Sequence, residues 1–368
     1  MIEGSQIMVG DSLNKTGANL LIKALQENNI NRMYEIVGIP VTDLARLAGL
    51  RGMKYYGFHR EDSAVNAAAA TGYLTQKTGV TLTVSAPGFL NGLTALAQAT
   101  KNCFPLIMIS GSSERHIIDL SQGDYEGFDQ YNAAKPFCKK AYRVDRAEDM
   151  GLAVARAIRT AVSGRHGGVY LDIPADTIVQ EDTADQSNFG VYKLVDPAPK
   201  QVPNDEAISR AVDLIKNAKK PFIILGKGAA YDQTEKQVQQ LVAETNIPFL
   251  PMSMAKRLIP DDSPHSAAAA RSLSLRNADV VIVIGARLNW MLSYGDAPQF
   301  NPHAKFVQLD IDATQFDFSQ PISVPLQGDL KSILGKLVPA LLATGYQAPT
   351  AWLEQIAQDT EKNDKKFA

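Results

Sequence analysis

A cluster of polar side chains, His59 to Asp62, lies four residues before a run of alanines, Ala67 to Ala70. Glu61 and Asp62 place carboxylates at the expected start of a helix. Alanine side chains are too small to fill a core alone, so the helix behind these carboxylates has a smooth surface that a ligand could approach. The alternative is an exposed carboxylate that only interacts with the helix dipole, which contributes about 0.5 kcal/mol.

The stretch ILGKGAAY is a second candidate site. Gly226 and Gly228 would let backbone N–H groups approach a phosphate, and Lys227 would add a positive charge. Tyr231 stands where a dinucleotide fingerprint has its third glycine, and Pro221 stands where a Walker loop has its first. A left-handed turn after a strand therefore remains the alternative.

Polar side chains follow several expected strands in the same half of the chain. Arg287 follows one buried run, Asp310 and Asp312 end another, and Asp329 follows a third. Ligands of open parallel sheets bind at the carboxyl ends of the strands. Cationic side chains there would suit phosphates, and carboxylates would suit ribose hydroxyls and an adenine amine. The pattern indicates a nucleotide site.

The elements that must position these residues alternate along the chain, with short β-branched runs between helical stretches. The predicted strands are Met33–Val37, Val80–Ser85, Leu106–Ser110, Val169–Ile173, Phe222–Leu225, Val280–Ile284 and Lys305–Asp310. The predicted helices are Thr16–Glu27, Asp62–Thr75, Ala147–Val162, Asp205–Ala218, Thr234–Glu244 and Leu330–Ala343. Apolar strands without alternation, separated by helices, predict an α/β fold with parallel sheets covered on both faces.

A proline-rich segment divides the chain. Residues 193–204 read KLVDPAPKQVPN, and proline both ends helices and removes a ladder donor, so this segment is predicted to be extended. Asn204 is expected to cap the next helix. We expect one domain at 1–190, a linker at 191–204 and a second domain at 205–343. The polar helix within 344–368 is expected to begin a linker to a further domain.

Composition narrows the function classes. The 368 residues are 45% hydrophobic and 21% charged with a net charge of −2, which gives no basis for binding nucleic acid or anionic membranes. No apolar run approaches the roughly 18 residues that a membrane span needs. Cys103 and Cys138 have no metal-site spacing and are compatible with a reducing cytoplasm, where we expect the protein to be.

Several longer stretches resemble one enzyme family. HREDSAVNAAAATGY, SAPGFLNGLTALAQA and NCFPLIMISGSSER resemble the pyrimidine-binding domain of thiamine-diphosphate-dependent enzymes. With YEIVGIPVTDLARL, QGDYEGFDQ, RTAVSGRHGGVYLDIP and LIKNAKKPFIILGKGAAY, the chain is similar to the oxalyl-CoA decarboxylases over essentially its whole length. The resemblance implies a pyrimidine-binding domain followed by a Rossmann-like middle domain. The family pattern reads Arg-His-Glu, where this chain has His59, Arg60 and Glu61.

The resemblance implies catalytic and cofactor-binding roles. Glu61 matches the glutamate that hydrogen-bonds N1′ of the cofactor's aminopyrimidine and favours the imino tautomer, which removes the thiazolium C2 proton. Ile39 matches a residue beside the cofactor and substrate, with a core isoleucine as the alternative. Tyr125 and Glu126 match a pair that lines the active site, with two polar residues of a surface loop as the alternative.

The resemblance also implies that ADP binds to the middle domain, as an activator. The matching positions are Arg165, Lys227, Arg287, Asp310 and Asp329. Arg165 belongs to the first domain and would have to reach across to a phosphate. The other four agree with the nucleotide site inferred from the strand ends.

The implied reaction is the decarboxylation of oxalyl-CoA to formyl-CoA and CO2 by a homodimer or homotetramer. Its Mg²⁺ and cofactor diphosphate are held by a Gly-Asp-Gly motif of a third domain, which 1–368 does not contain. We therefore expect no metal ligand in this chain and no activity of the chain alone. A 2-hydroxyacyl-CoA lyase and a catalytically inert nucleotide-binding subunit are the alternatives.

Overall fold

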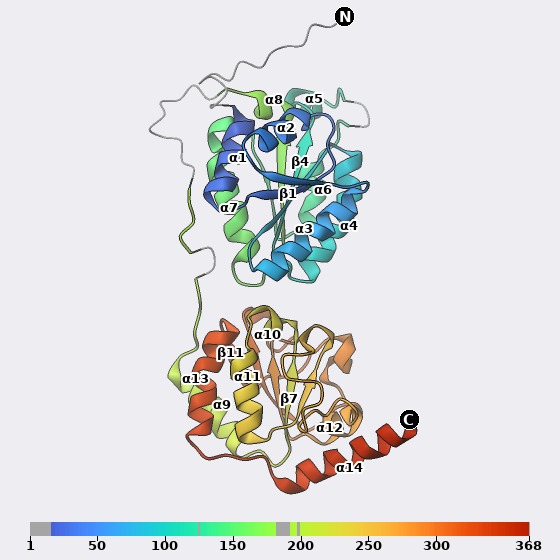
Figure 1. Cartoon of the computed structure of the whole chain (residues 1–368), viewed down its shortest axis with the longest axis vertical. Helices are drawn as coiled ribbons and strands as arrows, with labels where there is room; N and C mark the ends of the chain where they lie inside the picture. Colours follow the sequence, from blue (N-terminus) through green and yellow to red (C-terminus); the bar gives the residue numbers. More distant parts are fainter. Residues whose placement is uncertain (1–15, 124–125, 182–191, 197–198, 368) are drawn as a thin grey trace, which may run out of the picture. The chain divides into compact units, whose positions relative to one another are not determined.

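The chain forms two compact units, Met1–Pro199 and Lys200–Ala368. The computed structural model describes residues 16–123, 126–181, 192–196 and 199–367. Each unit contains one sheet with helices on both of its faces (Figure 1). The division at Pro199 falls within the segment 191–204, where the prolines predict a linker.

The sheet of the first unit has six strands, and every pair of neighbouring strands is parallel. The strands are β1 (Arg32–Glu35), β2 (Lys54–Gly57), β3 (Gly79–Thr83), β4 (Leu106–Ser112), β5 (Lys140–Arg143) and β6 (Gly168–Pro174). Their order in the sheet is β2-β1-β3-β4-β6-β5. Every residue of β3, β4 and β6 is buried, because these central strands are covered on both faces.

The helices of this unit are α1 (Gly17–Glu27), α2 (Thr42–Leu50), α3 (Glu61–Thr75), α4 (Pro87–Lys101), α5 (Arg115–Asp119), α6 (Gln130–Ala134), α7 (Met150–Val162) and α8 (Ala175–Val179). One hydrophobic core joins α1, α2 and α7 to one face of the sheet, and another joins α3, α4 and α6 to the opposite face. Figure 1 shows α1 and α7 on one side of β4 and α3 and α4 on the other.

The second unit repeats this architecture with five parallel strands. They are β7 (Pro221–Leu225), β8 (Phe249–Pro251), β9 (Val280–Ile284), β10 (Lys305–Asp310) and β11 (Val324–Gln327), in the order β11-β10-β9-β7-β8. The helices are α9 (Asp205–Lys216), α10 (Lys227–Tyr231), α11 (Glu235–Thr245), α12 (Arg271–Asn277), α13 (Leu330–Leu342) and α14 (Thr350–Phe367).

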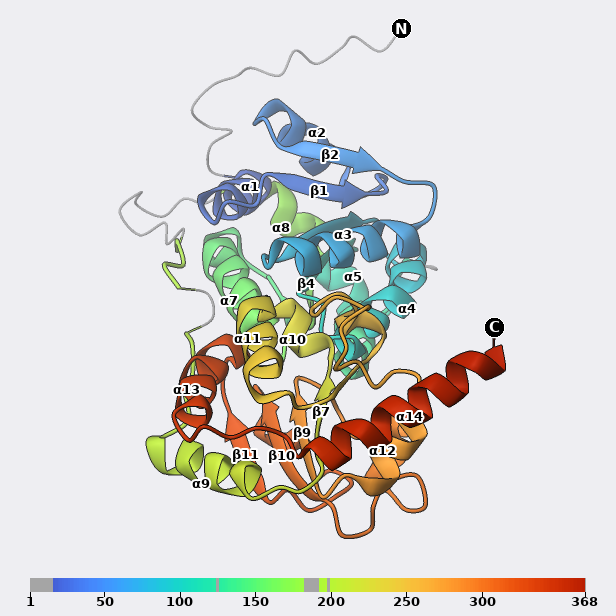
Figure 2. The same ribbon diagram turned by 60° about the horizontal axis from the view of Figure 1, so that its bottom comes forward.

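Two further cores cover the faces of this second sheet, one with α9, α11 and α13 and the other with α12 and α14 (Figure 2). Asn204 caps α9, as predicted, by accepting a hydrogen bond from the N–H of Ala207 at 2.9 Å. The polar helix α14 buries Trp352 and Ile356, and Nε1 of Trp352 donates to the carbonyl oxygen of Pro221. The first half of α14 is therefore part of the core of the second unit.

The predicted α/β class with parallel sheets is confirmed, and all seven predicted strands are present. The four strands that the pattern did not predict are β2, β5, β8 and β11. They are short, and each lies at an edge of its sheet. No helix within the described ranges is long and apolar enough to cross a membrane.

Candidate active site

Glu61 is placed by the connection from β2 to α3. Hydrogen bonding along this connection continues the sheet for one residue, because the N–H of Phe58 donates to the carbonyl oxygen of Glu35. The chain is still extended at Arg60, and Glu61 is the first residue of α3. The Glu61 side chain is half-buried at the carboxyl edge of the parallel sheet. Ligands of such sheets bind at this edge.

Asn91 and Gly88 of the neighbouring helix α4 define the environment of this carboxylate. Nδ2 of Asn91 donates to Oε2 of Glu61 at 3.1 Å. A Cβ atom on Gly88 would lie 3.3 Å from Oε1 of Glu61 and 2.5 Å from Cγ2 of Val84. The glycine therefore leaves the second carboxylate oxygen clear of a side chain that would otherwise press on it.

The alanines of α3 serve two purposes. Ala68 and Ala69 are buried, and a Cβ atom on Gly79 would lie only 1.9 Å from the carbonyl oxygen of Ala68. The small side chains on this side of α3 therefore allow the helix to approach β3 closely. Ala67 is half-buried and Ala70 is exposed, so these two positions add little side-chain bulk to the outer side of the helix.

The strand ends around Glu61 also hold a buried polar cluster that the sequence analysis did not identify. It contains Gln130 at the start of α6 and Asp172 of β6, both with no more than 2% of their surface exposed. Nε2 of Gln130 is 3.3 Å from Oδ1 of Asp172, and burial raises the pKa of Asp172 to about 6. A carboxylate inside the apolar run GVYLDIP was the signal available in the sequence.

Ile39 is exposed over 75% of its surface. The alternative of a core isoleucine is therefore wrong. The loop that carries it lies against the end of β3, since a Cβ atom on Gly38 would be 2.7 Å from Cγ1 of Val84 and Oγ of Ser85 is 3.5 Å from the carbonyl oxygen of Ile39. The loop that carries Ile39 and the first turn of α4 at Gly88 thus both contact Val84, at the same edge of the sheet.

Glu126 belongs to a loop that follows β4 and α5. The two ends of this loop touch, because a Cβ atom on Gly123 would lie 2.6 Å from Cα of Gly127. Oγ of Ser113 donates to the carbonyl oxygen of Glu126 at 3.4 Å, and the Glu126 side chain is half-buried. Tyr125 lies outside the residues that the structure describes.

Glu35 is a second carboxylate that the sequence analysis did not identify. Only 4% of its surface is exposed, its Oε2 has no hydrogen-bond partner among the described residues, and burial raises its pKa to about 6. Side chains alternate along a strand, so Glu35 shares the face of Met33, whereas Tyr34 faces α3 and hydrogen-bonds Thr71 at 2.5 Å. Glu35 therefore lies on the opposite face of the sheet from α3.

The residues around Glu61 are compatible with the pyrimidine end of thiamine diphosphate. An aminopyrimidine is flat, so it needs a carboxylate beside small side chains. Glu61 stands beside Gly88, and Asn91 fills one of the roughly four acceptor positions of its carboxylate. Ile39 provides exposed apolar surface at the same edge of the sheet.

In the second unit, four predicted nucleotide-binding residues stand at strand ends. Lys227 begins α10 after β7, Arg287 follows β9, Asp310 ends β10 and Asp329 precedes α13 after β11. The carboxyl ends of these parallel strands lie at one edge of the sheet. Asp329 caps α13, since its Oδ1 accepts from the N–H of Ser332 at 2.9 Å, and its Oδ2 lies 3.4 Å from Nζ of Lys200.

The glycine loop after β7 packs against the end of β9. The N–H of Gly226 donates to the carbonyl oxygen of Ile284, and the N–H of Gly228 donates to that of Gly285. A Cβ atom on Gly226 would lie 2.2 Å from the carbonyl oxygen of Gly285. These glycines are therefore needed for contact between two loops, and their N–H groups already donate to carbonyl oxygens rather than pointing toward an anion.

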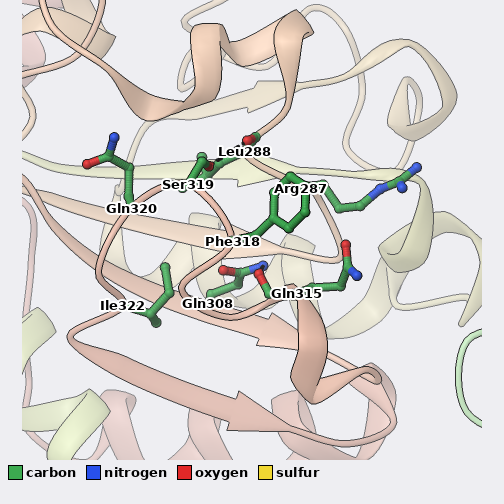
Figure 3. A pocket seen from close by; sticks show the side chains of 8 residues that line it. All are labelled: Arg287, Leu288, Gln308, Gln315, Phe318, Ser319, Gln320 and Ile322. Carbon is green, nitrogen blue, oxygen red and sulfur yellow. Dashed lines mark hydrogen bonds between the residues drawn. The ribbon is translucent and has the colours of Figure 1, made fainter.

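A small hollow lies beside Arg287 (Figure 3). Its volume is about 10 Å³, near the minimum for one water molecule, so it is too small to enclose a nucleotide. Figure 3 shows the Arg287 guanidinium at the opposite end of the group from Gln320 and Ile322. The lining residues are Arg287, Leu288, Gln308, Gln315, Phe318, Ser319, Gln320 and Ile322.

Arg165 belongs to the first unit. It follows α7, and its Nε donates to Sγ of Cys103 at 3.0 Å. The structure thus places four of the predicted nucleotide-binding residues in one unit and the fifth in the other. Within the described ranges, no three His, Cys, Asp or Glu side chains are placed to hold a metal ion together.

Comparison with known proteins assigns both units. Residues 15–133 match the model of the thiamine pyrophosphate enzyme N-terminal TPP binding domain, and residues 208–337 match that of the central domain. The chain is 49% identical to an oxalyl-CoA decarboxylase of Escherichia coli K12 over 98% of its length, which is 64% of that protein. The 2-hydroxyacyl-CoA lyases are more distant. The protein of Arabidopsis thaliana is 38% identical over 95% of this chain and 62% of its own length, and the human lyase 1 is 36% identical over 95% and 60%. The chain belongs to the thiamine pyrophosphate enzymes, of which it contains the N-terminal TPP-binding domain and the central domain.

Proposed function

We propose that the protein containing this chain catalyses thiamine-diphosphate-dependent decarboxylation of oxalyl-CoA. One carbon–carbon bond breaks, the terminal carboxylate leaves as CO2, and a proton replaces it to give formyl-CoA. The observation that carries this proposal is the 49% identity to an oxalyl-CoA decarboxylase across 98% of the chain. The two 2-hydroxyacyl-CoA lyases compared above are only 38% and 36% identical to this chain, so cleavage of a 2-hydroxyacyl-CoA has weaker support than decarboxylation of oxalyl-CoA.

Glu61 is proposed to hold the proton that is shared with N1′ of the aminopyrimidine. When bound, thiamine diphosphate supplies an electron sink for the electron pair that CO2 loss leaves behind. The Asn91 hydrogen bond fixes Oε2 of Glu61, so the carboxylate keeps one orientation. A fixed orientation matters because a proton held in a hydrogen bond depends strongly on distance and angle.

Ile39 is proposed to lie beside the cofactor and the substrate, and Tyr125 and Glu126 are proposed to line the active site. Support for Ile39 is its exposed apolar side chain at the carboxyl edge of the sheet. Support for Glu126 is its half-buried position in a loop whose ends are closed on each other. Tyr125, its neighbour in this loop, is proposed from the resemblance alone, to hydrogen-bond the acyl group.

The test of Glu61 uses the complete protein that contains this chain, assayed with oxalyl-CoA. Glu61→Gln keeps the shape of the side chain and removes its acidity, so turnover is expected to fall by about 100-fold or more. Asp62→Asn is the matched control: Asp62 is the next carboxylate along α3 and pairs with Arg60 at 3.1 Å. Turnover of Glu61→Gln within a factor of two of the unmodified protein would refute the assignment.

The substrate class is tested by supplying the same protein with oxalyl-CoA and with a 2-hydroxyacyl-CoA in parallel. The proposal expects CO2 and formyl-CoA from the first substrate and little cleavage of the second. Preferential cleavage of the 2-hydroxyacyl-CoA would assign the lyase activity instead. No turnover of either, with nucleotide binding retained, would indicate a non-catalytic nucleotide-binding subunit.

ADP is proposed to bind at the carboxyl edge of the second sheet and to activate the enzyme. Lys227 and Arg287 are the proposed phosphate contacts, and Asp310 and Asp329 are the proposed contacts of the ribose and the adenine. Support comes from the position of these four residues at the ends of adjacent strands.

Calorimetric titration with ADP tests this site. Arg287→Ala is expected to weaken binding by about tenfold or more, because a charged hydrogen bond contributes roughly 1.5–3 kcal/mol. Arg276→Ala removes an exposed arginine of α12 and is the control. Equal affinity of the two variants would exclude Arg287 from the site.

The proposal also includes Mg²⁺ as the ion that accompanies the cofactor diphosphate, without an assigned ligand in this chain. It further includes a cytoplasmic location and a homodimer or homotetramer. Light scattering on the purified protein tests the oligomeric state, and a monomer at assay concentration would refute it.

A further inference from the structure

The backbone at Ala86 has a conformation that L-residues rarely adopt. Its φ is 36° and its ψ is −88°, and it lies between the end of β3 and the first residue of α4. Such a conformation raises the free energy of the folded state by about 1–3 kcal/mol and persists only when the surrounding structure holds it in place. What holds Ala86 therefore also determines where α4 begins.

Gln130 holds Ala86. Its Oε1 accepts the N–H of Ala86 at 2.7 Å. Its Nε2 lies within hydrogen-bond distance of the carbonyl oxygen of Gly111 at 2.8 Å, the hydroxyl of Tyr170 at 2.9 Å and Oδ1 of Asp172 at 3.3 Å. All of these groups are buried. These bonds hold the Gln130 amide against β4 and β6. Because the same amide also binds the N–H of Ala86, the position of the turn after β3 depends on β4 and β6.

This turn carries the residues that surround Glu61. Gly88 follows Ala86 by two residues and lies against Oε1 of Glu61, and Asn91 lies one turn further along α4 and donates to Oε2. A shift at Ala86 would move both contacts together. A displacement of about 1 Å at a reacting group can lower a rate by about 100-fold.

We infer that Gln130 is a positioning residue for Glu61, acting through the constrained backbone at Ala86 and the start of α4. This inference rests on the proposed function of Glu61. Among the described residues, the hydrogen bonds of the Gln130 side chain go to Ala86, Gly111, Tyr170 and Asp172 and not to Glu61. The role of Gln130 is to keep Gly88 and Asn91 in register with Glu61.

Gln130→Met tests this role in the complete protein, because methionine has similar size but cannot accept the Ala86 N–H. Backbone hydrogen exchange in the peptide spanning residues 84–90 is expected to accelerate at least tenfold without cofactor. With cofactor, kcat is expected to fall about 10- to 100-fold with KM for oxalyl-CoA within threefold. The imino signal of the bound cofactor in circular dichroism is expected to weaken.

Gln130→Glu is the conservative variant and separates positioning from loss of stability. Its carboxyl group keeps an acceptor for Ala86, but when ionised it opposes the carboxylate of Asp172 in a buried space. The hydroxyl of Tyr170 also faces this space, and the positive charges of Arg143 and Arg115 act to lower the pKa of Asp172 from a distance. As the pH falls, the two carboxyl groups take up a proton that they can share, so the ratio of variant to unmodified kcat is expected to rise as pH falls.

Three outcomes would overturn the inference. They are unchanged exchange at residues 84–90 in Gln130→Met, unchanged kcat in that variant, or a kcat ratio for Gln130→Glu that is flat with pH. If Gln130→Met does not fold, the pH ratio of Gln130→Glu decides alone. Full turnover of Glu61→Gln would refute the proposed function instead, whereas the exchange measurement would still report on the Ala86 constraint.

Discussion

Replacement of Glu35 by glutamine should make the first unit more stable at neutral pH and leave it little changed in acid. Burial raises the pKa of Glu35 to about 6 from its ordinary value of 4.5. The folded protein therefore binds this proton more tightly than the unfolded chain does. The contribution of the protonated Glu35 side chain to the free energy of unfolding is fully present below pH 4.5, and it is lost as the pH rises through 6.

The size of the effect follows from the shift. A difference of about 1.5 pH units corresponds to about 1 to 2 kcal/mol in the free energy of unfolding once the group is ionised. Glu35→Gln cannot ionise, so its stability relative to the unmodified protein should increase by this amount between pH 4 and pH 8. The glutamine amide can also change the free energy of unfolding by a constant amount, but that amount does not vary with pH and so does not affect the comparison.

Urea unfolding can assign this change to one unit. Both tryptophans, Trp290 and Trp352, belong to the second unit, so fluorescence follows that unit alone while far-ultraviolet circular dichroism follows both. The Glu35→Gln change should appear in the dichroism transition. Glu27→Gln, at an exposed position of α1, is the control and should show less than about 0.5 kcal/mol of change with pH.

A Glu35→Gln difference that is flat between pH 4 and pH 8 would refute the reasoning, because it would mean that the folded protein does not disfavour the charge. Burial raises the pKa of Asp172 and of Asp232 to about 6 as well. Stability of the unmodified protein should therefore decline with pH more steeply than Glu35 alone requires, which is why the comparison is made between variants.

Two further predictions concern the helices that carry the site. Gly79→Ala should destabilise the first unit by about 3 kcal/mol or more, because its Cβ would lie 1.9 Å from the carbonyl oxygen of Ala68, and circular dichroism in urea measures this. Gly57→Ala is the control, with nothing within 4 Å of the added atom. Asn91→Ala removes the hydrogen bond to Glu61 and should lower kcat/KM about tenfold with folding preserved. Unchanged kinetics would show that Glu61 needs no such support.

The central strands could be predicted because every position in them is buried and is therefore mostly occupied by an apolar residue. β9 reads VVIVI and β4 begins LIMI, since both faces of these strands contact helices. The edge strand β2 reads KYYG and is exposed along its whole length, so no run of buried apolar residues marks it in the sequence. Only its pairing with β1 makes it a strand.

The candidate site was predictable in part. The position of Glu61 before the alanines indicated an accessible carboxylate, and the structure places this carboxylate half-buried at the carboxyl edge of the sheet. The glycines at 226 and 228 indicated a phosphate loop, but their N–H groups donate to the carbonyl oxygens of Ile284 and Gly285. A glycine that admits a ligand and one that admits another backbone have the same sequence signal.

The family resemblance proposed Glu61 as the candidate carboxylate, whereas the sequence by itself determined the fold class and placed a division near the prolines. Fold class and division depend on residue type and local spacing, which act within one element or between neighbouring elements. Tertiary structure alone decided that Asn91 reaches Glu61 across 30 positions and that Gln130 reaches Ala86 across 44. Such contacts depend on the path of the chain through the sheet, because side chains distant in sequence meet only where strand order and helix packing bring them together.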